Sequence, residues 1–271
     1  MAAARKQRLD LALVERGLLA SREQARARIL AGDVSVGGRM IDKAGTLVAD
    51  TAEISLRPTA TYVSRGGLKL AHALDRFGVD VTGRVALDSG ASTGGFTDCL
   101  LRRGAARVYA VDVGYGQLDW RLRSDPRVVV MERVNLRELA SLPEPIDLAT
   151  LDLSFISLRL VLEPVRRLLR PAGEVVALVK PQFEAGRGRV GRGGVVRDPA
   201  IHAAVLEEVL DWAAGHGYVA RGLTASPIKG PAGNVEFLAH LVRSDAPAGR
   251  DDAPDRRALV DQALREAAEL V

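Results

Sequence analysis

The 271-residue sequence predicts an α/β fold, in which a mostly parallel seven-stranded sheet follows a small N-terminal α+β domain. From Val81 onward, short apolar runs alternate with amphipathic helical segments. Two of the first runs end in an acidic residue, at Asp88 and Asp112. Before residue 57 the pattern differs, because two short helices precede a hairpin. The later alternation is typical of a doubly wound sheet with helices on both faces.

The predicted elements of the sheet domain are short and rich in Val, Leu and Ala. A helix containing Lys69 comes first and runs through Phe77, and another follows the first strand through Cys99. Each apolar run is bounded by glycine, proline or polar residues, which favour turns. The predicted strands are 85–88, 108–112, 128–131, 148–152, 174–180, 219–225 and 234–239, and the longer helices are 158–169 and 201–215.

The first 56 residues form the predicted N-terminal domain. A helix over 9–17 ends at a glycine, and a second begins with Ser21 as N-cap and Gln24 at the capping-box position. We expect Ala25, Ile29 and Leu30 to face inward on that second helix. An alternating segment with a Gly-Gly turn, residues 34–41, predicts a hairpin.

Basic residues concentrate in this N-terminal domain. The whole chain has a formal net charge of +4, and its first 43 residues hold nine basic against five acidic residues, an equal excess. The arginines of the second helix suit phosphate contacts, although a solvated helix face would look the same. The residues expected to contact a nucleic acid here are Arg5, Lys6, Arg8, Arg22, Arg26 and Arg28.

Composition also sets the expected domain boundaries and environment. We expect domains at 1–56 and 63–244, a linker at 57–62, and a polar linker with a C-terminal helix at 245–271. A single cysteine, Cys99, fits a reducing cytoplasm. We find no secretory signal and no apolar run long enough to span a membrane, so we expect a cytoplasmic protein without membrane partners.

A glycine-rich loop follows the first predicted strand. Its pattern, Asp88-x-Gly90-x-x-x-Gly94-Gly95, differs from the dinucleotide fingerprint, which disfavours a nicotinamide oxidoreductase. No Gly-Lys-Ser/Thr follows, so the loop is not a P-loop. A loop at a strand's carboxyl end, leading into a helix N-terminus, nevertheless indicates a nucleotide-sized ligand.

Four charged residues are not explained by hydrophobic periodicity. Lys69 opens a helix, Asp152 and Lys180 end strands, and Glu236 lies inside an otherwise apolar predicted strand. Each alone fits a surface charge or a structural ion pair. Because the carboxyl ends of parallel strands meet at one crevice, the four together predict a shared cleft.

These residues carry a resemblance to known families. The N-terminal segment 6–45 resembles the alpha-L RNA-binding motif of ribosomal small-subunit protein four, and the glycine loop resembles the first motif of class I methyltransferases. The Lys-Asp-Lys-Glu set is similar to the tetrad of FtsJ-type ribose methyltransferases. With the segments 64–69, 112–118, 152–157, 180–184 and 233–236, the sequence most resembles the TlyA (haemolysin A) family.

The resemblance implies a Rossmann-like fold that uses S-adenosylmethionine (SAM) to methylate cytidine 2′-oxygens in rRNA of ribosomal subunits. It implies no metal requirement, and we expect a monomer or a weak homo-oligomer. The tetrad Lys69, Asp152, Lys180 and Glu236 would be catalytic, with Lys180 orienting or deprotonating the hydroxyl. The residues expected to bind SAM are Asp88, Gly90, Ala91, Ser92, Thr93, Gly94, Phe96, Thr97, Asp112, Val113, Asn135 and Asp152.

Three further arginines lie near the predicted cleft and complete the expected RNA contacts: Arg65, Arg187 and Arg189. The last two belong to the glycine-rich loop 186–194, which is either a lid, an RNA contact or an Arg-Gly segment without a role. Two other functions stay open, an RNA-binding protein with a silent methyltransferase fold and a membrane-active haemolysin. The second would need a membrane-inserting segment or a secretion signal.

Overall fold

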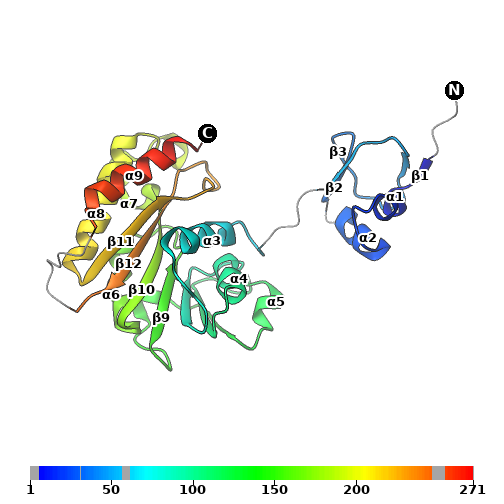
Figure 1. The fold of residues 1–271 in the computed structure, drawn as a ribbon. Helices are drawn as coiled ribbons and strands as arrows, with labels where there is room; N and C mark the ends of the chain where they lie inside the picture. The colour runs from blue at the N-terminus through cyan, green and yellow to red at the C-terminus, as the bar shows by residue number, and fades with distance from the viewer. Residues whose placement is uncertain (1–5, 31, 57–61, 246–253, 271) are drawn as a thin grey trace. The chain divides into compact units, whose positions relative to one another are not determined.

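A computed structural model of the protein describes residues 6–30, 32–56, 62–245 and 254–270. The chain forms two compact units, Met1–Ala60 and Thr61–Val271 (Figure 1). Most of the predicted linker, residues 57–61, lies outside the described residues, as does Arg5. The exact linker boundaries therefore remain a prediction.

The N-terminal unit is a small α+β domain, as predicted. A buried cluster that includes Leu9, Leu13 and Ile29 packs its helices against its strands. One sheet has the order β3-β2-β5, and β1 pairs with β4. The elements are β1 Lys6–Arg8, α1 Leu9–Glu15, α2 Arg22–Leu30, β2 Val34–Val36, β3 Arg39–Met40, β4 Leu47–Ala49 and β5 Ile54–Leu56.

Helix α2 begins largely as its sequence predicts. The Ser21 hydroxyl accepts a hydrogen bond from the Gln24 amide at 3.2 Å, while the Gln24 side chain accepts from the Ala20 amide at 3.3 Å. Ala25 and Ile29 are fully buried, but Leu30 is 74% exposed, so its predicted inward orientation was wrong. Leu30 is the last residue of the helix and lies about 100° around its axis from Ile29.

The second unit contains the predicted seven-stranded sheet, in the order β11-β12-β10-β9-β6-β7-β8. Only β12 runs antiparallel to its neighbours within this sheet. The chain moves outward from β6 to β7 and β8 and then returns to β9 on the other side of β6, which creates a topological switch point. The strands are β6 Val85–Ser89, β7 Arg107–Asp112, β8 Val128–Glu132, β9 Ile146–Leu151, β10 Leu169–Val179, β11 Tyr218–Ala225 and β12 Phe237–Arg243.

Helices cover both faces of this sheet (Figure 1). Successive strand residues pack on opposite faces: Ala86 belongs to the hydrophobic cluster with α3 and α4, and Leu87 to the cluster with α6, α8 and α9. The helices are α3 Gly66–Phe77, α4 Gly95–Arg102, α5 Trp120–Arg123, α6 Leu162–Leu168, α7 Pro181–Glu184, α8 Pro199–Gly215 and α9 Arg256–Ala268, with 3₁₀ turns η1 Leu136–Glu138, η2 Leu158–Leu160, η3 Arg187–Arg189 and η4 Arg192–Gly194.

Two predicted elements differ from the observed ones. Strand β12 begins at Phe237, so Glu236 precedes the strand rather than lying inside it. The side chain of Asn234 accepts from the Val196 amide and donates to the Gly194 carbonyl, which holds this segment in a loop. The helix predicted over 158–169 is a 3₁₀ turn followed by α6, because β10 already begins at Leu169.

The C-terminal helix α9 packs on the sheet domain through buried Val260 and Ala263. Its Glu266 accepts hydrogen bonds from the Thr224 hydroxyl at 2.6 Å and the Ala225 amide at 3.1 Å, and it pairs with Arg76 at 3.0 Å. Burial alone would raise the pKa of Glu266, but these hydrogen bonds lower it to about 2. The charged carboxylate thus fastens α9 to β11.

We expect Glu266→Gln to destabilise the second unit near neutral pH. Because folding lowers the pKa of this carboxyl, its contribution is present above the unfolded value of about 4.5 and is lost as the pH falls through about 2. The difference in thermal unfolding midpoint between variant and wild type should shrink below about pH 4.5. Glu269→Gln, an exposed change at the C-cap of the same helix, is the control. A difference that is constant with pH would contradict this prediction.

Candidate active site

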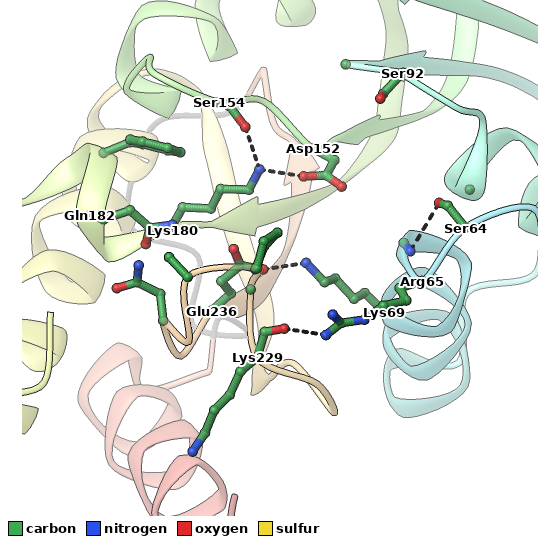
Figure 2. Close-up of a pocket in the computed structure, with 18 of the residues that line it drawn as sticks. Ser64, Arg65, Lys69, Ser92, Asp152, Ser154, Lys180, Gln182, Lys229 and Glu236 are labelled. Carbon is green, nitrogen blue, oxygen red and sulfur yellow. Dashed lines mark hydrogen bonds and ion pairs between the residues drawn. The ribbon is translucent and has the colours of Figure 1, made fainter. Parts of the chain in front are cut away.

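A cavity of about 760 Å³ opens where the carboxyl ends of β6, β9 and β10 meet. It brings all four charged residues of the predicted tetrad together: Lys69, Asp152, Lys180 and Glu236 (Figure 2). A volume of this size is typical of small-molecule sites. The topology therefore places the glycine loop and the tetrad at one site, as the sequence predicted.

The glycine loop between β6 and α4 forms one wall of the cavity. Gly90 has φ +82°, and a Cβ there would lie 2.5 Å from the Asp152 carbonyl oxygen, so only glycine fits. Asp112, at the end of β7, accepts from the amides of Ser92 at 2.8 Å and Gly114 at 2.7 Å. Asp112 therefore orders the loop through its backbone.

Asp88 lies beneath the loop and is fully buried. It accepts a hydrogen bond from the Thr97 hydroxyl at 2.6 Å, and its other oxygen is 3.4 Å from the Thr150 hydroxyl. Burial raises the pKa of Asp88 to about 7. This carboxyl holds β6, β9 and the start of α4 together from behind the cavity.

The four tetrad residues form two ion pairs. Lys69 Nζ lies 2.5 Å from Glu236 Oε2, and the two side chains are only 8% and 2% exposed. Lys180 Nζ lies 2.7 Å from Asp152 Oδ1. Figure 2 shows the two lysines reaching into the site from different elements, Lys69 from α3 and Lys180 from the end of β10.

Several residues of the site were missed by sequence reasoning. Ser154 lines the cavity and accepts from Lys180 Nζ at 3.1 Å, and Phe155, with φ +63°, is 90% exposed at its rim. Buried Asn234 anchors the loop before Glu236, as described above. All three lie in the segments 152–157 and 233–236 that carry the family resemblance, but Ser, Phe and Asn give no signal in a charge pattern, so their places in the site come from the fold.

Of the residues expected to bind SAM, about half line the cavity. The lining residues come from the glycine loop, the first turn of α4 and the position after β9, and they are Gly90, Ala91, Ser92, Thr93, Phe96 and Asp152. The others pack behind the loop or lie along the ends of β7 and β8 outside this lining, and they are Asp88, Gly94, Thr97, Asp112, Val113 and Asn135.

The N-terminal arginines gather around one buried carboxylate. Asp10 is fully buried and pairs with Arg8 at 3.0 Å, Arg22 at 3.1 Å and Arg26 at 3.3 Å. The pKa of Asp10 is well below its usual range, and the hydrogen bonds from Arg8 are the largest cause. Each of the three arginine side chains is about half exposed, so the cluster presents fixed cations to solvent.

The remaining predicted RNA contacts fall in different environments. Arg28 pairs with Asp33 and is only 16% exposed. Arg65 lines the cavity and donates to the Lys229 carbonyl at 2.7 Å (Figure 2). Arg189 is held by the Ala185 carbonyl and by Glu208. Lys6 is exposed on β1, and the side chain of Arg187 lies outside the described structure.

The glycine-rich loop 186–194 reaches the cavity. It contains the turns η3 and η4, and Gly193 and Gly194 belong to the cavity lining. Asn234 holds its C-terminal end through the Gly194 carbonyl. The loop therefore borders the site.

The residues around the cavity fit an adenosyl ligand better than a metal ion. The glycine loop leads into the N-terminus of α4, and Asp112 ends the adjacent strand β7, an arrangement typical of nucleotide sites in doubly wound sheets. Across the residues described, no group of three or more His, Cys, Asp or Glu side chains is placed to hold a metal ion. None of the described helices combines the length and apolar character needed to cross a membrane.

Comparisons with known proteins agree with this geometry. Residues 62–243 match the family of FtsJ-like methyltransferases, and residues 7–54 match the S4 domain. The fold and site thus define a methyltransferase of the FtsJ type joined to an S4 domain. Within this class the chain belongs to the TlyA family, as its relatives show.

The 16S/23S rRNA (cytidine-2′-O)-methyltransferase TlyA of Mycobacterium tuberculosis is 50% identical over 88% of this chain and 90% of its own length. Hemolysin A of Brachyspira hyodysenteriae is 40% identical over 87% of this chain and 99% of its own. A solved Streptococcus thermophilus structure, provisionally named a hemolysin, matches with 45% identity and TM-score 0.72 over 98% of both chains.

We expect Asp88→Asn to leave the glycine loop in place, because an amide can keep the hydrogen bond from Thr97. Folding raises the pKa of Asp88. The stability that the protonated carboxyl contributes is therefore complete below its pKa in the unfolded chain, about 3.8, and is lost as the pH rises through about 7. The variant should therefore gain stability relative to wild type between about pH 4 and 7, measured by thermal unfolding. A gain that does not grow with pH would contradict a buried, protonated Asp88.

Proposed function

We propose that this protein transfers the methyl group of SAM to a ribose 2′-oxygen of rRNA. The observation that carries the proposal is the cavity itself, where the glycine loop of a SAM-type fold meets the Lys69–Glu236 and Lys180–Asp152 pairs. The TlyA relatives, named as rRNA cytidine-2′-O-methyltransferases, support a cytidine substrate.

Bound SAM would supply an electrophilic methyl carbon on its sulfonium sulfur. The ribose hydroxyl is a weak nucleophile, so the protein must align it for in-line attack, an effect that contributes up to about 7–11 kcal/mol in ideal cases. Lys180 Nζ would accept the hydroxyl proton in its neutral amine form, or would orient the hydroxyl while the proton is released to solvent. S-adenosylhomocysteine and the methylated ribose are the products.

The remaining tetrad residues hold this arrangement. Asp152 fixes the Lys180 side chain and belongs to the segment that borders the glycine loop. Lys69, paired with Glu236, would contact the ribose or its phosphate. The glycine loop residues Gly90, Ala91, Ser92 and Thr93 would hold the donor.

The S4 unit would deliver the RNA. Arg8, Arg22 and Arg26 present a fixed cationic cluster around Asp10, and such clusters contact phosphates. Arg65 lies at the cavity, where the acceptor strand would enter. A partner that is an RNA of the ribosome would place the protein in the cytoplasm.

A membrane-active haemolysin is the weaker alternative. The name is carried by a relative, Hemolysin A of Brachyspira hyodysenteriae. The two lysine–carboxylate pairs at the cavity favour methyl transfer over membrane activity. A silent methyltransferase fold would be indicated only if labelled methyl never reached RNA.

We expect Lys180→Ala to reduce methyl transfer at least about 100-fold, because it removes the group that handles the hydroxyl proton. SAM affinity, measured by titration calorimetry, should stay within about threefold, since the glycine loop is unchanged. The assay follows radiolabelled methyl transfer from SAM to purified ribosomal subunits. Arg257→Ala, an exposed change on α9, is the control and should behave as wild type. Wild-type rates in Lys180→Ala would exclude the assigned role.

We expect the double variant Arg22→Ala/Arg26→Ala to bind ribosomal subunits about tenfold more weakly at about 0.1 M salt, since two phosphate contacts are lost. The slope of log affinity against log salt should fall by about 1.5 to 2. Arg256→Ala/Arg257→Ala removes the same charge from α9 and is the matched control. Equal weakening by both doubles would mean that overall charge, rather than this cluster, governs binding.

A further inference from the structure

The ammonium group of Lys180 is held by two neighbours from one segment. Its Nζ lies 2.7 Å from Asp152 Oδ1 and donates to Ser154 Oγ at 3.1 Å. Both partners follow directly after β9, and all three residues line the cavity. Figure 2 shows Lys180 reaching between these two side chains.

A lysine nitrogen is tetrahedral, so three of its four directions are available beyond the bond to Cε. Asp152 and Ser154 each accept one hydrogen and so occupy two of them. The third direction carries a hydrogen in the charged form and the lone pair in the neutral form. Two acceptors therefore decide where the lone pair points, whereas Asp152 alone would leave it two choices.

Ser154 can orient the Lys180 nitrogen and contributes little to the packing of the fold. Its side chain is exposed at the cavity rather than packed in the core, so the hydroxyl contributes little to folding. The neighbouring segment is already fastened by Glu184, which accepts from the Ser157 hydroxyl at 2.6 Å and the Leu158 amide at 2.7 Å. The loop that carries Ser154 therefore does not depend on the contact with Lys180.

We propose that Ser154 is a positioning residue, which aims the free direction of Lys180 Nζ at the acceptor hydroxyl. This proposal rests on the proposed function, since it needs Lys180 to act on a ribose 2′-OH. Ser154 takes no proton in the reaction. It accepts one N–H of Lys180 throughout, while the hydroxyl proton moves to the nitrogen lone pair as the O–C bond forms.

Ser154→Ala should lower kcat about tenfold, because the lone pair is then aimed correctly for only part of the time. The KM for ribosomal subunits and the Kd for SAM should stay within about twofold, since neither ligand loses a contact that holds it. Ser154→Thr keeps the hydroxyl and should restore kcat to within about threefold of wild type. The assay uses the full-length protein, saturating SAM with a labelled methyl group, and purified ribosomal subunits.

Several outcomes would overturn the proposal. Wild-type kcat in Ser154→Ala would mean that Asp152 alone fixes Lys180. An equal loss of kcat in Ser154→Ala and Ser154→Thr would mean that Ser154 acts through the packing of its loop. A change confined to the Kd for SAM would mean that Ser154 contacts SAM rather than positioning Lys180. Full activity of Lys180→Ala in the same assay would remove the Lys180 role on which this proposal rests. Absence of methyl transfer by the wild-type protein would remove the proposed function itself, so the failures are distinguishable.

Discussion

The amide of Asp152 donates to the carbonyl oxygen of Ser89 at 3.0 Å, where β6 and β9 end side by side. This pairing lies at the switch point of the sheet, and both halves of the cavity depend on it. The chain leaves β6 as the glycine loop and leaves β9 as the segment that carries Asp152 and Ser154. Gly90 packs against the Asp152 carbonyl so closely that a side chain there would force the halves apart.

The two ion pairs show where the molecule gives up stability. Charges buried as deeply as those of Lys69 and Glu236 lose several kcal/mol of hydration each, and their attraction repays this only with good geometry. Apolar residues of similar size would serve folding at least as well. A second pair, Lys180–Asp152, lies in the same cavity, which is what the proposed catalytic role of the four residues predicts.

Much of this arrangement was predictable from sequence. Apolar runs fixed the positions of the parallel strands, and the acid or lysine at their ends pointed to the crevice because parallel strands share one functional edge. The prediction was wrong for Glu236, since apolar neighbours concealed the loop that Asn234 anchors through Gly194 and Val196. Likewise, the roles of Asp10 and Ser154 come from contacts between segments, which no local pattern contains.

The central claim is that one cavity moves a methyl group from SAM to a ribose oxygen of rRNA. Its most direct test is to incubate the protein with methyl-labelled SAM and separately purified ribosomal subunits, and then to identify the labelled atom by mass spectrometry of nucleosides. We predict a 2′-O-methylated ribose, on cytidine, in at least one subunit. Label on a base, or no label in either subunit, would contradict the account.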